Sequence, residues 1–202
     1  MLSASELAER IKATDKAIDH GLSIVPSPDL VAMVENGASS LDLRLGRWFR
    51  TMRHPKAAVL ELSEENESRT DAFVSKEHFV RFNDRFLLHP GQFVLGITLE
   101  WIRLSFDLAG YVTGKSSWGR RGLIIETAAG IHPGFTGCLT LELANVGNIP
   151  IALVPGMTIC QLFLHQVKDS GMRARSQFVG RRKPGMGTVK RDKFLTELSD
   201  PT

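Results

Sequence analysis

The sequence predicts a mainly β protein, a sandwich or barrel-like fold built as one globular domain. Short apolar or alternating runs begin near Ser40 and continue for most of the chain. Turn signals such as His89-Pro90-Gly91 and Pro155-Gly156 separate them at roughly the eight to twelve residues that are typical of all-β folds. A length of 202 residues lies within the range of a single domain.

Two short helices are expected before the β region, both at the periphery. Ser3 and Glu6 have the spacing of a capping box, and Leu7 and Ile11 follow at helical spacing. A second helix is predicted with Ser27 as N-cap and Pro28 at its first position, ending before Gly37.

The strands are expected where apolar residues cluster or alternate between the turns. In chain order, the expected strands span residues 58–62, 93–98, 102–106, 123–127, 139–144, 149–154 and 158–165. No internal repeat accompanies them, which argues against a solenoid or propeller.

Charge is distributed unevenly. From Lys168 to the end there are nine Lys/Arg and four Asp/Glu, a balance of +5, so the rest of the chain carries sixteen against eighteen, or −2. Such a basic tail can be a solvated arm, a weak nucleic-acid patch or the counter-charge for a polyphosphate. The sequence composition alone leaves these alternatives open.

The cytoplasm is the expected compartment. No apolar run approaches the roughly 20 residues needed to span a bilayer, and no export signal is recognised at the N-terminus. Cys138 and Cys160 lie in apolar surroundings without a Cys-x-x-Cys pattern, so we expect both to be small buried side chains rather than a disulfide.

Glu142 is the leading candidate for a functional side chain. It lies between Leu141 and Leu143 in an otherwise apolar run, where alternation places it on the same face as Thr140. That face can be solvated surface, or it can border a cavity. In a cavity, partial desolvation raises the pKa of a carboxyl group toward neutrality, as proton transfer near pH 7 requires.

Three short motifs, in order and at consistent spacing, are similar to those of the dCTP deaminases, a branch of the trimeric dUTPase-like superfamily. They are Gly-Lys-Ser-Ser-x-x-Arg at 114–120, Thr-Ala-x-x-Ile-x-Pro-Gly at 127–134 and Leu-Glu at 141–142. The resemblance covers about residues 1–185. It implies a dUTPase-like β-clip or distorted β-barrel at 1–170, and a flexible basic arm at 171–202 that closes over a nucleotide.

The resemblance also implies roles for individual residues. Glu142 corresponds to the catalytic glutamate, Ser116 and Arg120 orient the attacking water and the base, and the carbonyl oxygen of Ala128 holds that water. Lys115 and Ser117 correspond to phosphate contacts. The remaining implied substrate contacts are His132, Thr140, Leu141, Gln161, Gln177, Phe178 and Arg181.

The implied reaction is zinc-independent deamination of dCTP to dUTP and ammonia. The two cysteines are 22 residues apart and the zinc-deaminase pattern is absent, so a carboxylate must act as general acid and base. We therefore expect no protein-bound metal. Mg²⁺ is expected only through the substrate triphosphate.

Four positions depart from the patterns of this superfamily. His132 stands where the family has Asp, and Phe135 where dUTPases have Tyr, so the base expected for triphosphate cleavage is missing. Gln177 and Arg181 shift one cation of the arm by four positions. The departures at 132 and 135 argue against a dUTPase and against a bifunctional deaminase-diphosphatase. Those at 177 and 181 leave open a modified or differently phosphorylated cytosine nucleotide as the substrate.

The predicted partners are dCTP and related nucleotides such as dUTP or dTTP, within a homotrimer that the resemblance implies. Neither nucleic acid nor membrane is an expected partner. Two alternatives stay open: a nucleotide hydrolase of the dUTP diphosphatase kind, and a non-catalytic, nucleotide-binding regulatory homotrimer.

Overall fold

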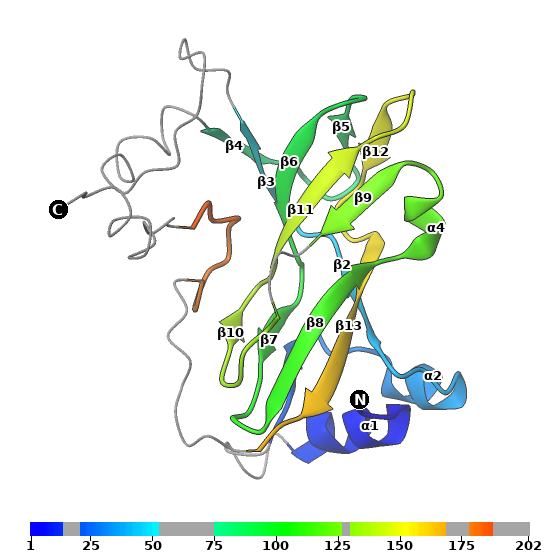
Figure 1. The fold of residues 1–202 in the computed structure, drawn as a ribbon, viewed down its shortest axis with the longest axis vertical. Coiled ribbons are helices and arrows are strands. Elements are labelled where there is room, and N and C mark those ends of the chain that lie inside the picture. The colour runs from blue at the N-terminus through cyan, green and yellow to red at the C-terminus, as the bar shows by residue number, and fades with distance from the viewer. Residues whose placement is uncertain (14–20, 53–74, 127–129, 169–177, 188–202) are drawn as a thin grey trace, which may run out of the picture.

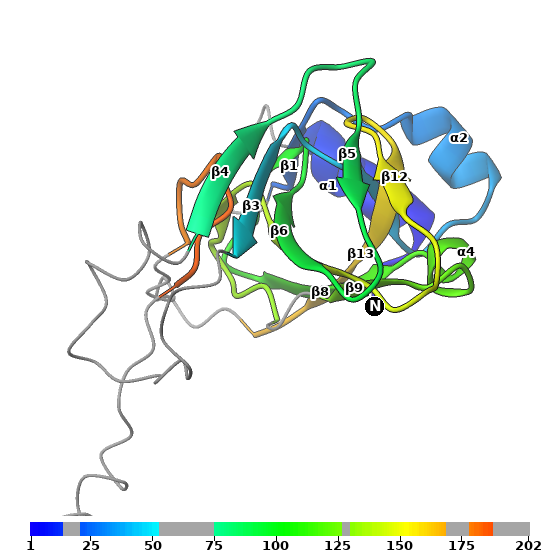
Figure 2. The same cartoon turned by 90° about the horizontal axis from the view of Figure 1, so that it is seen from above.

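The computed structural model describes residues 1–13, 21–52, 75–126, 130–168 and 178–187, and it is mainly β as predicted. Four sheets surround one apolar core, with two helices at one end (Figure 1). The described strands form no closed barrel, because they are divided among separate ladders. Seen from above, the sheets enclose the core on several sides (Figure 2).

The two N-terminal helices are peripheral, as predicted. Helix α1 (Ala4–Ala13) begins with the expected capping box, in which the Ser3 amide donates to Glu6 Oε2 at 2.7 Å. Helix α2 (Leu30–Glu35) is capped by Asp29, whose Oδ1 accepts from the Val31 and Ala32 amides, so Ser27 was the wrong N-cap. Gly37 follows the helix with φ +59°, the conformation expected just past a C-terminus.

The largest sheet carries the strand with Glu142. Its strand order is β4-β3-β6-β11-β9. The strands span β3 Trp48–Met52, β4 Ser75–Phe79, β6 Phe93–Ile97, β9 Leu123–Glu126 and β11 Thr140–Asn145, and every neighbouring pair is antiparallel.

Three smaller sheets complete the fold. One has the order β2-β13-β8, with β2 Leu41–Arg44, β8 Leu108–Gly114 and β13 Thr158–Gln166. Another has the order β1-β7-β10, with β1 Ser23–Val25, β7 Trp101–Arg103 and β10 Thr136–Gly137. The third pairs β5 Phe86–Leu88 with β12 Ile151–Leu153, and the one-turn helix α4 (Ser116–Gly119) lies between β8 and β9.

The predicted strands inside the described ranges are confirmed, with small shifts at their ends. The largest shift is in the 102–106 prediction, because β7 ends at Arg103. Residues 58–62 and Thr127 lie outside the described residues. The sequence prediction missed β1–β5, β8 and β10, several of which lack clear alternation.

None of the helices in the described part of the chain is long and apolar enough to cross a membrane.

Candidate active site

Glu142 occupies a half-buried position on the outward face of β11. Burial alternates along this strand, with Leu141 and Leu143 fully buried in the core and Thr140 and Glu142 partly exposed. The predicted alternation is therefore confirmed. It also means that the Leu141 side chain points into the core, so any ligand contact at this position must come from its backbone.

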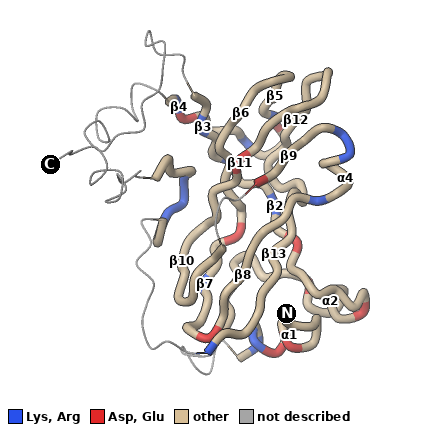
Figure 3. The backbone as a smooth tube through the Cα atoms, in the orientation of Figure 1, with Lys and Arg blue, Asp and Glu red and all other residues tan. Residues whose placement is uncertain are grey.

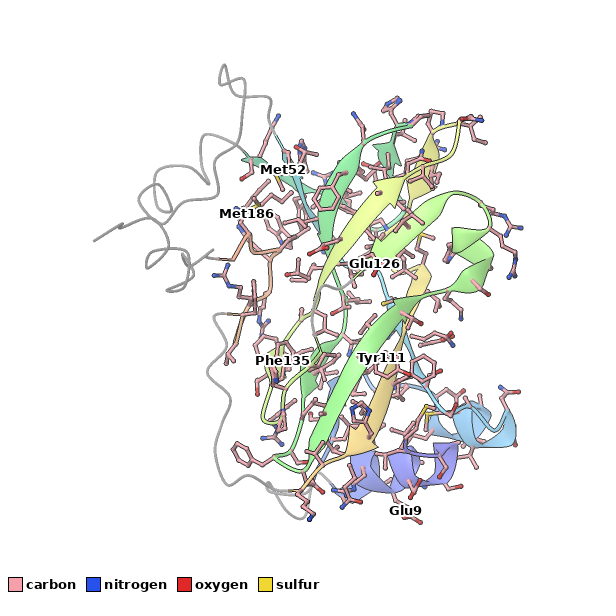
Figure 4. All side chains as sticks on the ribbon, viewed as in Figure 1. Glu9, Met52, Tyr111, Glu126, Phe135 and Met186 are labelled. Carbon is pink, nitrogen blue, oxygen red and sulfur yellow. The ribbon has the colours of Figure 1, made fainter. Side chains whose placement is uncertain are left out.

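A row of side chains crosses the sheet on the same face as Glu142. Register pairs Glu142 with Leu95 of β6 on one side and with Glu126 of β9 on the other. The row continues from Leu95 to Arg50 and then to Glu77, whose Oε1 accepts from Arg50 Nη2 at 2.8 Å. Figure 4 labels Glu126 where β9 and β11 run alongside each other. Two carboxylates thus stand opposite each other at one end of the row.

Ser116, Ser117 and Arg120 belong to the turn of α4. The Trp118 indole fixes this turn by donating to the Thr158 carbonyl at 2.9 Å, while Ser116 and Arg120 are exposed. The Ser117 carbonyl accepts from the Arg121 guanidinium at 2.7 Å. The turn therefore presents its polar side chains outward from a fixed backbone.

The α4 turn lies beside the end of β11 that is farther from Glu142. The Val146 amide donates to the Gly122 carbonyl, and Leu123 pairs with Asn145, three residues beyond Glu142. At about 3.3 Å per strand residue, this offset is about 10 Å along the backbone. Within the described residues, no hydrogen bond or ion pair joins Glu142 to Ser116 or Arg120.

Lys115 and Gln161 are brought together by Asp42. The Lys115 ammonium lies 2.6 Å from Asp42 Oδ2, and Gln161 Nε2 donates to Asp42 Oδ1 and to Ser40 Oγ, both at 3.2 Å. Asp42, Gln161 and Ser40 border a cavity of about 440 Å³ next to α2. Asp42 was not singled out from the sequence, although it lies within the residues 1–185 that the resemblance covers.

His132 lies exposed in the turn between Ile131 and Phe135. Its carbonyl accepts from the Phe135 amide at 3.2 Å, and Gly134 has φ +73°, which favours glycine. Ile131 pairs with Gly110 of β8, so the turn is held against the sheet while the imidazole faces outward. Ala128 and Gln177, two further predicted site residues, lie outside the described residues.

Residues 178–187, here called the arm, run along β10 and the start of β11 (Figure 1). The Gly180 amide donates to the Thr136 carbonyl at 2.7 Å, and the Cys138 amide donates to the Arg181 carbonyl at 3.0 Å. The Arg181 guanidinium lies 5.7 Å from the centre of the Phe178 ring. Both predicted arm residues are thus held near the strand that leads to Glu142.

The next residues of the arm fasten it to the large sheet. The Lys183 ammonium lies 2.9 Å from Glu77 Oε2 and 4.0 Å from the centre of the Trp48 ring. The Gly185 amide reaches Thr140 Oγ1 at 3.4 Å, on the face that carries Glu142. Figure 3 shows the basic stretch of the arm as a blue length of tube beside the sheet.

The pKa of Glu77 agrees with its contacts to the arm and to β3. The hydrogen bond from Lys183 lowers the pKa of Glu77, with a further contribution from Arg50, although burial acts in the opposite direction.

Burial raises the pKa of the Cys138 thiol to about 11 and that of Cys160 to about 12, so both thiols stay protonated near pH 7. Both cysteines are free. Among the residues described, no group of three or more His, Cys, Asp or Glu is placed to hold a metal ion.

Comparison with known proteins places this geometry in a family context. A model of the dCTP deaminase-like family matches residues 1–167. A protein of Corynebacterium kroppenstedtii named dCTP deaminase, dUMP-forming, is 46% identical over 156 residues, covering 76% of this chain and 78% of that protein. A dCTP deaminase of Natronomonas pharaonis is 34% identical over 199 residues, or 96% of each chain.

A solved structure has the same fold. The crystal structure of 2′-deoxycytidine 5′-triphosphate deaminase from Agrobacterium tumefaciens superimposes with a TM-score of 0.57 at 22% identity. The match covers 82% of this chain and 47% of that one, so this chain spans about half the length of the Agrobacterium protein.

Proposed function

This chain belongs to the dCTP deaminase-like family, and from that premise we propose that it removes the 4-amino group of dCTP by hydrolysis. The observation that carries the proposal is the position of Glu142. It is a half-buried carboxylate beside Thr140 on the outward face of a strand, within the segment that the family model matches. Such a carboxylate can exchange protons with a bound ligand while its backbone stays fixed by the core.

In the proposed reaction, Glu142 takes a proton from water and passes it to N3 of the base. The water oxygen then bonds to C4. Glu142 takes the remaining proton from the new C4 hydroxyl and delivers it to the amino nitrogen, so that the bond from C4 to this nitrogen breaks and the C4 carbonyl forms. Ammonia leaves and a uracil base remains. Positioned acid–base transfer of this kind contributes about 10²- to 10⁴-fold to the rate.

The proposed supporting groups are Ser116, Arg120 and the carbonyl oxygen of Ala128, which orient the water and the base. Thr140 and the backbone of Leu141 lie next to Glu142 and are suited to meet the pyrimidine edge. His132 is proposed to contact the sugar, while Lys115 and Ser117 contact the phosphates. Gln161, which reaches Asp42 beside Lys115, is assigned to the phosphate end.

We propose that the site is completed in a homotrimer. Ser116 and Arg120 face outward from α4 and are joined to Glu142 by no described contact within one chain, so a neighbouring copy is the natural source of both groups. Phe178 and Arg181 of the arm, together with Gln177 just before it, are proposed as further substrate contacts. Mg²⁺ is proposed to arrive with the triphosphate, whose charge the Lys and Arg side chains balance.

The proposed product is dUTP. His132 and Phe135 replace the Asp and Tyr that the related phosphate-cleaving enzymes use, so this chain lacks the expected base for that step. A second candidate is deamination followed by diphosphate release, giving dUMP. The dUMP-forming name of the relative at 46% identity favours it.

The test is ammonia release from dCTP with Mg²⁺, after treatment of the protein with a zinc chelator. We expect ammonia in an amount equal to the uracil nucleotide formed, with no loss after chelation. Glu142→Gln should abolish turnover but still bind dCTP, whereas Glu35→Gln, an exposed acid of α2, should behave as the wild type. Nucleotide binding without any ammonia would instead favour the non-catalytic alternative.

A further inference from the structure

A second cavity, of about 480 Å³, lies between the arm and the edge of the sheet around β7. Six of its lining residues decide its chemistry: Arg47, Trp48, Phe79, Trp101, Cys138 and Arg182. None of these residues is assigned a contact with dCTP in the proposed deamination. The volume lies within the range of about 300–1,000 Å³ that is typical of small-molecule sites.

The charge of this cavity is positive. The Arg47 guanidinium lies 4.3 Å from the centre of the Phe79 ring and 4.7 Å from that of Phe82, and the Arg182 guanidinium lies 4.8 Å from the centre of the Trp101 ring. Within the described part of the chain, neither guanidinium is paired with a carboxylate and no Asp or Glu lines the cavity. Both cations are therefore available to an anion.

The walls of the cavity are flat aromatic rings. Trp48 and Phe79 are in contact, with ring centres 4.9 Å apart and planes tilted by 55°, and Trp101 contributes a second indole. Planar bases stack on such rings whatever their identity, because every base has a π face. Guanidinium groups next to the rings suit phosphate oxygens, which they can bind in a bidentate manner.

The cavity is separate from the position of Glu142. Cys138, Thr140 and Glu142 are each partly exposed, whereas Leu139 and Leu141 between them are buried, so the three lie on the same side of the chain with Thr140 in the middle. The arm crosses at Thr140, where the Gly185 amide meets its hydroxyl. The cavity reaches Cys138 on one side of this crossing, and Glu142 lies on the other, about 13 Å away at strand spacing.

We propose that this cavity is a second nucleotide-binding site, which holds a base against Trp48 or Trp101 and its phosphates against Arg47 and Arg182. Because Arg182 belongs to the arm, a nucleotide bound there would also fasten the arm to the sheet. The site would thereby link the concentration of a second nucleotide to the closure of the arm. Since stacking is tolerant of base identity, a purine nucleotide should enter this cavity. The proposed dCTP site at Glu142, which is built for a pyrimidine, should exclude a purine.

The experiment uses the full chain with dATP as the probe. We expect dATP to bind at one site per chain by equilibrium dialysis and to quench tryptophan emission. The double substitution Trp101→Leu with Arg47→Gln should weaken dATP binding by about tenfold or more. Its turnover of dCTP should match that of the wild type, measured as ammonia release.

Two matched variants and two partial ligands sharpen the result. Arg85→Gln removes an exposed positive charge away from the cavity and should leave dATP binding unchanged. Arg182→Gln should weaken binding as the double variant does, which guards against misfolding of the latter. Deoxyadenosine and inorganic triphosphate, tested alone, separate stacking from phosphate recognition, and each should bind more weakly than dATP.

The proposal is overturned if dATP does not bind, or if the variants bind it as the wild type does. Loss of dCTP turnover in the double variant, in a chain that remains folded by circular dichroism, also overturns it, because the cavity would then be part of the substrate site. Failure of the deamination proposal is recognised separately. It would show as absence of ammonia from the wild type, whatever the result with dATP.

Discussion

Glu142 of β11 lies directly opposite Glu126 of β9 in the register of the large sheet. Partners in an antiparallel pair point to the same face, and like charges directly opposite each other destabilise a sheet by roughly 0.2–1 kcal/mol. Natural sheets avoid such pairs unless the function requires one of the two charges. The pairing therefore supports a functional role for the half-buried member, Glu142.

Replacing either carboxylate should stabilise the protein. Glu142→Gln and Glu126→Gln each remove the like-charge contact, so each should raise the free energy of unfolding by roughly 0.2–1 kcal/mol at pH 7. Urea unfolding measures this change. The two variants should differ in turnover, since Glu142→Gln is expected to be inactive. An inactive Glu142→Gln variant that is also less stable than the wild type would point to a structural role instead.

The arm should loosen when its aromatic contact is removed. Trp48→Leu eliminates the ring under the Lys183 ammonium, a contact worth about 0.5–1 kcal/mol at an exposed site. Trypsin should then cut faster after Arg181 and Arg182, and KM for dCTP should rise while kcat changes little. Phe93→Leu, which alters an exposed ring on the neighbouring strand β6, is the control. Equal cleavage rates in the two variants would contradict the contact.

Lys115 should matter for phosphate binding more than for stability. Its pair with Asp42 is exposed, with 28% and 50% of the two side chains accessible, and such pairs contribute about 0–1 kcal/mol. Lys115→Gln should therefore change the melting temperature little, raise KM for dCTP and make KM less dependent on salt. Asp42→Asn is the matched control, because it breaks the same ion pair but keeps the cation. If both variants raise KM equally, the ion pair itself matters rather than the phosphate contact.

Stability at acid pH should depend on Asp107. Burial raises the pKa of this carboxyl, but hydrogen bonds from the Ser105 hydroxyl and the Arg10 guanidinium outweigh it and hold the pKa below its usual value. A lowered pKa means that the stabilisation is present above the pKa of the unfolded chain, near 3.9, and disappears as the pH falls through the folded value.

Asp107→Asn should therefore cost about 1–3 kcal/mol of stability at pH 7. The difference from the wild type should shrink between about pH 5 and pH 2, because the wild type loses its ionised partner there. Urea unfolding across this range measures the effect. A constant difference at all pH values would show that the loss comes from packing rather than from the charge.

How much of the fold the sequence predicts depends on the kind of signal. The β11 segment was predicted because its leucines alternate with polar residues over a whole strand, and the burial pattern follows that alternation. β3 and β4 were missed because their charged residues, such as Arg50 and Glu77, pair with each other across strands. In such a pair, each polar group is satisfied by a partner that is distant in the sequence. The hydrophobic periodicity of a single strand cannot reveal that partner.

The candidate site shows the same limit. The resemblance selected Glu142 and Ser116 as members of ordered motifs, but their separation within one chain follows from strand register, which the motifs do not encode. Glu126, Asp42 and the arm contacts of Trp48 were not singled out, because each acquires its importance only through a partner distant in the sequence. Ser27 was chosen as the cap over Asp29 because both residue types are good N-caps and local sequence does not rank them.

The identity of residue 132 should decide the product. His132 is exposed in a turn fixed by Gly134 and by the pairing of Ile131 with Gly110, so a substitution there changes chemistry with little effect on the backbone. The wild type should convert dCTP to dUTP and ammonia without diphosphate, because the aspartate that activates water in related phosphate-cleaving enzymes is absent. His132→Asp restores that carboxylate and should add dUMP and diphosphate to the products, which ion-exchange chromatography resolves. His132→Asn, similar in size but unable to act as a base, should release no diphosphate. If the wild type itself forms dUMP, another group supplies the base, and the expectation of a dUTP product is wrong.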